Sequence, residues 1–353
     1  MSDKWIAFNV IGDSLEKTKS LLFSSFKASF WLKLALVVFL VNGGINAGSN
    51  SKLYEFDSPV ELMANLPLLI VLAALFLTII LFFAYLGNIA VFVFLESVLQ
   101  KKVEVFDWFQ DNMKRGLKLF LFNIFLGAVT VLATIIVILP GIGIYQGISG
   151  GAKLIGLVAY GIVAATAYLA LLIALTIVGS FTKDFVVPLM VAGEKGLRDS
   201  WHELAQVIKA NKGQFIMYVA ARLVLGILTG IVFLVITVIM IIILSISFFV
   251  IDLSAGTVGS LIFSPSAAGA AIDSPPIMIA LKLAILALMV VFAYITTIMT
   301  LPIHVFHRYY SLLFIERIIP ELGLLEGAGR KDEEDSGKQD DESAGKIFVE
   351  VDK

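Results

Sequence analysis

The stretch TKDFVVPLMVAGEKGLRDSWHELAQVIKANKG, residues 182–213, separates two of the most apolar runs of the chain. It gathers acidic, basic and histidine side chains, so it is either a working site or a turn between membrane spans. From Leu197 onward, apolar residues recur at helical spacing and charged residues lie largely elsewhere on the helix. We expect Pro188 and Gly193 to break the chain before this helix. The pattern favours an interfacial helix whose apolar side faces lipid.

The composition around this stretch is that of a membrane protein. The chain is 59% hydrophobic and 15% charged, whereas soluble domains carry about 25% charged residues. Six runs reach or approach the roughly 20 apolar residues that a helix needs to cross the hydrocarbon. Because backbone groups in hydrocarbon must be satisfied within their own segment, these runs predict an all-α bundle of six transmembrane helices. The runs are Ser29–Gly44, Leu66–Leu95, Gly116–Leu139, Leu154–Phe181, Phe215–Ile251 and Pro276–Ile303.

Lysine and arginine alternate in number along the connections between these runs. The N-terminal segment has five, the loops have one, five, one, five and none, and the C-terminal tail has seven. The positive-inside rule assigns the basic connections to the cytoplasm. This alternation predicts a multi-pass protein of the plasma membrane with both termini cytoplasmic.

Each basic segment is also amphipathic and precedes a pair of spans, which predicts three cytoplasmic interfacial helices. Residues 1–325 then form the transmembrane domain, divided into hairpin units at 12–95, 103–181 and 196–303. The units are either an internal repeat or independent uses of one hairpin plan. Residues 326–353 are acidic and lack an apolar pattern, so we expect a disordered cytoplasmic tail. This tail could bind a protein partner.

Basic residues near the spans are the candidates for lipid contact. Arg222 is the one charge well inside an apolar run. That run is about 55 Å of helix, so we expect Arg222 to lie near the phosphates and snorkel; a substrate or gating role is the alternative. The residues expected to contact lipid headgroups are Lys101, Lys102, Lys114, Arg115, Arg222 and Arg308.

Other residues concern the interior of the bundle. A polar cavity would be lined by Asn88, Asn123, Thr166 and Tyr218, although hydrogen bonds between helices explain the two asparagines equally well. Gly226 and Gly230 form a GxxxG motif, which lets two helix backbones approach closely. We expect this motif to pack inside the bundle; a dimer face is the alternative.

The chain offers little for catalysis. His304 and His307 are three residues apart, but a metal site would also need a nearby carboxylate. The chain has no cysteine, and it has no P-loop, HExxH or GxSxG motif. We therefore expect no catalytic residues, no metal, no other cofactor and no nucleic-acid partner. The bilayer is the expected partner.

Asp184, Pro188, Gly196, Ser200 and Trp201 together form a pattern that resembles polytopic prokaryotic membrane families of unknown function. It also resembles the membrane domain attached to some glycerophosphodiester phosphodiesterases. The catalytic barrel of those enzymes, with its metal site, is missing, so the resemblance implies a helical membrane module without hydrolytic activity. We expect a non-catalytic accessory or organising module that contacts lipid headgroups. The alternative is a carrier or channel for a small or lipophilic solute.

Overall fold

A computed structural model describes residues 5–24, 26–42, 59–147, 151–262 and 275–325. All regular structure in these ranges is helical. In chain order the helices are α1 (Ile6–Phe23), α2 (Ala28–Val41), α3 (Pro59–Gln100), α4 (Val105–Asp111), α5 (Met113–Gly147), α6 (Gly151–Phe181), the π-helix η1 (Thr182–Val186), α7 (Val187–Ala192), α8 (Leu197–Ala210), α9 (Lys212–Ile262), α11 (Pro275–Ile318) and the 3₁₀ helix η2 (Pro320–Leu322).

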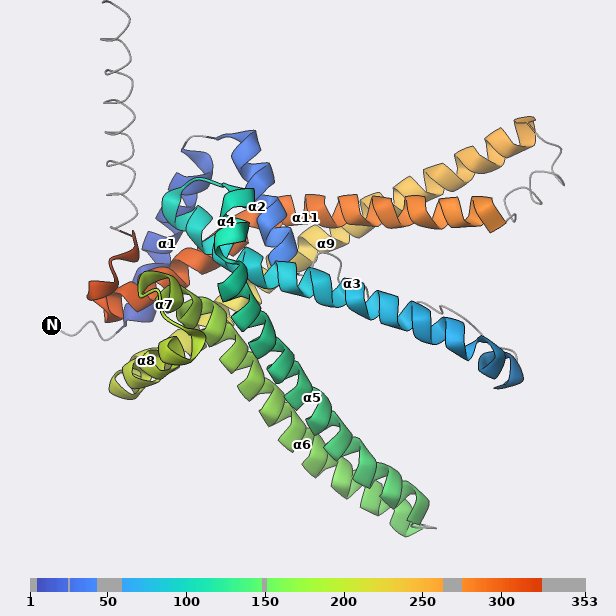
Figure 1. Cartoon of the computed structure of the whole chain (residues 1–353), viewed down its shortest axis with the longest axis horizontal. Helices are drawn as coiled ribbons and strands as arrows, with labels where there is room; N and C mark the ends of the chain where they lie inside the picture. The colour runs from blue at the N-terminus through green and yellow to red at the C-terminus, as the bar shows by residue number, and fades with distance from the viewer. Residues whose placement is uncertain (1–4, 25, 43–58, 148–150, 263–274, 326–353) are drawn as a thin grey trace, which may run out of the picture.

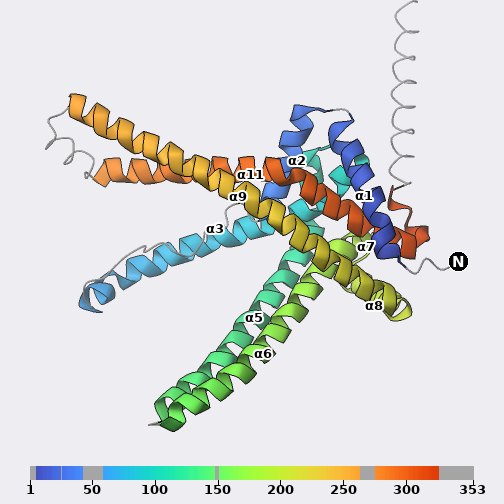
Figure 2. The same cartoon turned by 180° about the vertical axis from the view of Figure 1, so that it is seen from behind.

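The helices form one packed head from which three arms diverge (Figures 1 and 2). The head contains α1, α2, α4, α7 and α8, with the ends of α3, α5, α6, α9 and α11 that meet them. The arms are the N-terminal part of α3, the α5–α6 hairpin and the α9–α11 hairpin. Along α3 the change is abrupt, because Phe83 is 47% exposed and Ile89 is 1% exposed.

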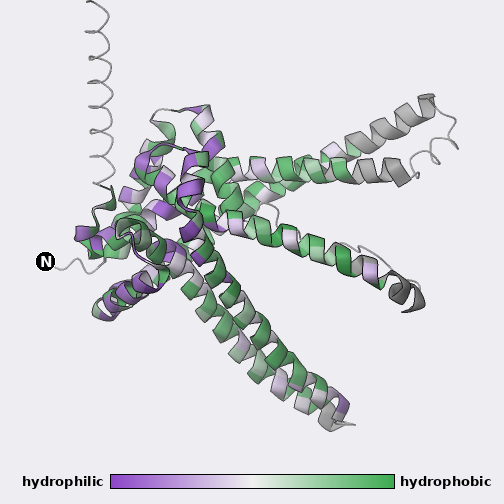
Figure 3. Cartoon of the chain, viewed as in Figure 1, coloured by the Kyte–Doolittle hydropathy of each residue, from purple (hydrophilic) through white to green (hydrophobic). Residues whose placement is uncertain are grey.

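The arms are apolar on their surface (Figure 3). Large side chains such as Ile136, Val163 and Leu234 are well exposed along them. So much apolar surface is unfavourable in water, and it identifies hydrocarbon as the surroundings of the arms. The protein is therefore a multi-pass membrane protein.

Five helices in the described ranges are long and apolar enough to cross a membrane. They are Ala73–Gln100, Met113–Gly147, Leu154–Ala192, Lys212–Ser247 and Leu286–Ile318. The first predicted span, Ser29–Gly44, instead contains the short helix α2. Its 14 residues extend about 21 Å, less than the roughly 30 Å of hydrocarbon.

The direction of α2 also differs from the one expected of the first span, which would run outward from the cytoplasm. The Tyr294 hydroxyl donates to the Leu32 carbonyl at 2.7 Å, and the Asn42 amide lies 3.5 Å from His304 Nε2. The order of these two contacts is the same along both helices, so α2 runs parallel to α11. The described ranges therefore contain five helices of spanning length and do not confirm the six predicted from the sequence.

The apolar faces of the predicted interfacial helices lie against protein. Helix α1 packs along α11, and α8 buries Leu204 in the core. The Trp201 ring faces Phe122, with centroids 6.3 Å apart. Helix α4 has only seven residues, and its Trp108 is buried. Contrary to expectation, protein rather than lipid covers these buried faces.

Two glycines allow helices to meet closely in the head. A Cβ on Gly87 would lie 2.6 Å from the Leu40 carbonyl oxygen, and a Cβ on Gly116 would lie 2.5 Å from Ile89 Cγ1. The first glycine joins α3 to α2, and the second joins α5 to α3. Small residues are used in this way where lipid tails offer no hydrophobic driving force between helices.

The GxxxG motif does not have this role. Gly226 and Gly230 are exposed on α9, and no heavy atom of another described helix lies within 4 Å of a Cβ placed on either. The expectation that the motif packs inside the bundle is therefore wrong for the described chain. The sequence pattern did not distinguish it from the glycines that do pack.

Replacement by alanine should separate the two kinds of glycine. Gly87→Ala or Gly116→Ala introduces a methyl group that overlaps a neighbouring helix, so each should lower stability by about 1–3 kcal/mol. Gly226→Ala is the control, because it adds no overlap and alanine favours helix by up to about 1 kcal/mol. Thermal unfolding in a neutral detergent measures all three. Equal stability of the three variants would contradict this assignment of contacts.

Candidate functional site

A π-helical turn lies where α6 enters the head. Between Thr182 and Val186 the helix widens, and the Val187 N–H donates to the Thr182 carbonyl five residues earlier. In this register the next carbonyl, that of Lys183, would accept from residue 188. That residue is proline, which has no N–H.

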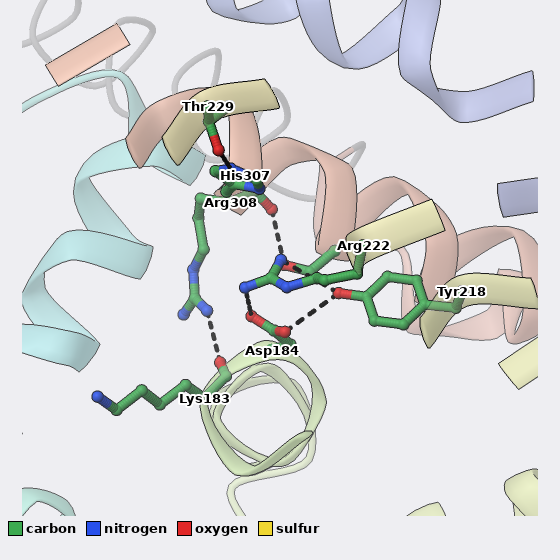
Figure 4. Close-up of polar contacts among 8 residues, drawn as sticks. Lys183, Asp184, Tyr218, Arg222, Thr229, His307 and Arg308 are labelled. Carbon is green, nitrogen blue, oxygen red and sulfur yellow. Dashed lines mark hydrogen bonds and ion pairs between the residues drawn. The ribbon is translucent and has the colours of Figure 1, made fainter. Parts of the chain in front are cut away.

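Arg308 of α11 supplies the missing donor. Its Nη1 donates to the Lys183 carbonyl oxygen at 2.6 Å (Figure 4). An unpaired carbonyl in the interior of a membrane protein is costly, so this bond compensates directly for Pro188. Contrary to the expectation from the sequence, the chain does not break at Pro188. The helix continues to Ala192 and ends at Gly193.

Asp184, the next residue, joins the same turn to α9. Its Oδ1 lies 3.1 Å from Arg222 Nη2, and its Oδ2 accepts from the Tyr218 hydroxyl at 3.1 Å. Arg222 Nη1 in turn donates to the Tyr218 oxygen at 3.3 Å. We call Lys183, Asp184, Tyr218, Arg222 and Arg308 the junction. It connects η1, α9 and α11, which are far apart in the sequence.

Aromatic rings enclose the carboxylate side of the junction. Tyr218 stacks on Tyr310 with ring centroids 5.3 Å apart, and it lies 4.5 Å from Phe314 and 4.8 Å from Phe185. All four residues are buried. These rings exclude water from the carboxylate, and an ion pair is stronger where the surroundings are less polarisable.

The charges in the junction do not balance. Arg222 and Arg308 face a single carboxylate, and Arg308 is near enough to Asp184 to interact with it electrostatically. Arg308 is only 6% exposed, and its Nε and Nη2 have no hydrogen-bond partner among the described residues. A buried guanidinium is stable when paired and hydrogen-bonded, so Arg308 is the incompletely satisfied member of the site.

The two histidines on α11 face different helices. His307 Nε2 lies 3.1 Å from the Thr229 hydroxyl of α9, whereas His304 contacts Asn42 at the end of α2. No group of three histidine or acidic side chains within the described ranges could hold a metal ion. The described chain therefore does not assemble the two-histidine metal site.

The expected headgroup contacts fall into two sets. Lys101, Lys102 and Lys114 are exposed, and the half-buried Arg115 donates to Asn112 Oδ1 at 3.3 Å. Arg222 and Arg308 lie in the junction, where protein groups hold them. Surface contact with lipid stays a prediction for the first set. The second set was expected at headgroups, but its present partners are Asp184, Tyr218 and the Lys183 carbonyl.

The expected polar lining is not gathered in one place. Asn123 donates to Asn88 at 2.5 Å and thereby joins α5 to α3, as a hydrogen bond between helices. Thr166 is exposed on α6 and donates to the Ile162 carbonyl of its own helix. Tyr218 is buried in the junction. Sequence reasoning noticed Asp184 and Tyr218 separately and did not connect them to Arg222.

A double-mutant cycle tests the link between Pro188 and Arg308. Arg308→Met leaves the Lys183 carbonyl without a donor and should lower stability by about 1–3 kcal/mol. In the Pro188→Ala background the restored N–H should reduce that loss by about 1 kcal/mol. Arg317→Met, on the same helix but exposed, should cost under about 0.5 kcal/mol. Strictly additive losses in thermal unfolding would argue against the link.

The comparisons with known proteins give one match. The family described as "Family of unknown function (DUF7544)" matches residues 5–325. No curated protein and no solved structure matches the chain, and nothing in these comparisons links it to glycerophosphodiester phosphodiesterases. Because the match spans the head, all three arms and the whole junction, the chain belongs to this family of unknown function, DUF7544.

Proposed function

We propose that the protein is a non-catalytic organising module of the plasma membrane. Its head lies among the lipid headgroups at the cytoplasmic face, and its three arms extend into the hydrocarbon. Both termini are cytoplasmic in this arrangement. This orientation requires an even number of crossings, as in the six spans predicted from the sequence.

The observation that carries this proposal is the separation of charge from apolar surface. Hydrophilic residues gather on the head, and the arms are almost continuously apolar (Figure 3). Exposed cations lie on the head. Lys101 follows the last residue of α3 in a left-handed conformation, with φ 53°, and Lys114 is the second residue of α5. Cations in this position attract anionic headgroups, each with about 1 kcal/mol.

Single-cysteine variants test the topology, because the natural chain has no cysteine. Phe106→Cys and His202→Cys place a thiol on exposed parts of the head, and Ile142→Cys places one near the tip of the α5–α6 arm. In intact cells a membrane-impermeant maleimide should label position 142 only. Positions 106 and 202 should react after permeabilisation. Labelling of 106 and 202 from opposite sides would rule out the proposed orientation.

Charge reversal tests the contact with headgroups. Lys101→Glu with Lys102→Glu should lower the affinity for phosphatidylglycerol roughly tenfold or more. Lys209→Glu with Lys212→Glu changes the charge equally on exposed residues at the turn between α8 and α9. Phosphatidylglycerol retained after extraction, measured by quantitative lipid mass spectrometry, should fall only in the first pair. Equal retention in both pairs would count against the proposal.

A carrier or channel for a small or lipophilic solute is the other candidate function. It would need a polar lining along the membrane part of the chain. Asn88 and Asn123 bind each other, Tyr218 binds Asp184, and Thr166 lies apart on α6. This arrangement gives the organising module the stronger support.

A further inference from the structure

The excess positive charge of the junction has a defined location. Asp184 is bonded to Arg222 and Tyr218, so its oxygens are directed toward α9. Arg308 reaches the other side of the turn, where it donates to a neutral carbonyl oxygen. Its Nε and Nη2 have no acceptor among the residues that the structure describes. The junction therefore lacks one anionic hydrogen-bond acceptor beside Arg308.

Lys183 is the exposed cation next to that position. Figure 4 shows the Lys183 and Arg308 side chains on one side of Asp184, with Arg222 and Tyr218 on the other. The Lys183 side chain is exposed, whereas Arg308 is buried. The ammonium group of Lys183 is flexible, and the guanidinium behind it is fixed. The free Arg308 nitrogens are covered by protein, so an anion reaches them only when a covering side chain moves aside.

We propose that this pair binds a phosphate group, with Arg308 as the buried donor and Lys183 as the outer one. Guanidinium groups match the geometry of phosphate oxygens, and lysine adds a mobile point charge. One bound anion would give the free Arg308 nitrogens their acceptors and offset the excess charge. Basic pockets between membrane helices on the cytoplasmic side bind phosphate headgroups of lipids. The phosphate could belong to such a lipid or be free in solution.

The proposed phosphate site rests on the proposed position of the head at headgroup level. It is more specific than a general attraction between surface lysines and anionic lipid. The surface lysines of α3 and α5 attract anionic lipid without a fixed geometry. The Lys183–Arg308 pair is a single site, whose affinity depends on the charge balance inside the junction. Changes at Lys183 and at Asp184 should therefore move the affinity in opposite directions.

Thermal unfolding of the purified full chain in neutral detergent tests the site. Phosphatidylglycerol, inorganic phosphate at constant ionic strength, and diacylglycerol are titrated separately. Phosphatidylglycerol or inorganic phosphate should raise the wild-type midpoint, and diacylglycerol should not. A response to inorganic phosphate identifies a free-phosphate site. A response to phosphatidylglycerol alone identifies a lipid site.

Two variants with opposite expectations make the test specific. Lys183→Gln removes an exposed ammonium group and should raise the apparent Kd about tenfold, whereas Lys209→Gln, the same change on α8, should leave it unchanged. Asp184→Asn removes the competing carboxylate and should lower the Kd about tenfold, while lowering the midpoint without ligand. If Asp184→Asn does not fold, the comparison of Lys183→Gln with Lys209→Gln decides.

The outcome that overturns the inference is distinct from failure of the proposed function. No midpoint shift with either phosphate probe, or the same Kd for Lys183→Gln and Lys209→Gln, would eliminate the site. Retained phosphatidylglycerol could still depend on Lys101 and Lys102 in that case. Conversely, a phosphate response that needs Lys183, with no effect of the Lys101 and Lys102 reversals, would support the site alone.

Discussion

A proline inside a buried helical turn sets the central constraint on this fold. Pro188 removes the N–H that would satisfy the Lys183 carbonyl, and the π-helical turn places that carbonyl toward α11. In this environment water does not readily replace the missing donor. Arg308 does so from the last long helix. The consequence is a buried cation, which is tolerable only with charged or polar partners nearby.

The remaining contacts of the junction follow from that cation. Asp184 lies one residue beyond the carbonyl that Arg308 caps, so one turn of helix presents a neutral acceptor and a charged one. The carboxylate also binds Arg222 and Tyr218, which brings α9 to the same place. Two of the three arms are thereby fixed to one helical turn. The aromatic rings around Tyr218 strengthen this attachment by excluding water.

The sequence predicted those features that depend on local composition. Hydropathy and helix length identify the membrane helices because each span satisfies its own backbone. Local composition did not predict the junction, whose members are as far apart in the sequence as Lys183 and Arg308. The length of the apolar run around Arg222 predicts a snorkelling side chain, but length alone does not reveal a partner. The proline rule predicts a break at Pro188 because it takes no account of a donor from another helix.

The divergence of the arms is a consequence of helix length. The α9 span, Lys212–Ser247, has 36 residues and extends about 54 Å, well beyond the roughly 30 Å of hydrocarbon. A helix with excess apolar length accommodates by tilting. Helices that tilt from a common attachment must spread with depth, as the arms do in Figures 1 and 2. In the described chain, different arms then pack against one another only near the head, which is where Gly87, Gly116 and the junction lie. Gly226 and Gly230 lie farther along α9, where no other helix of the described chain approaches them.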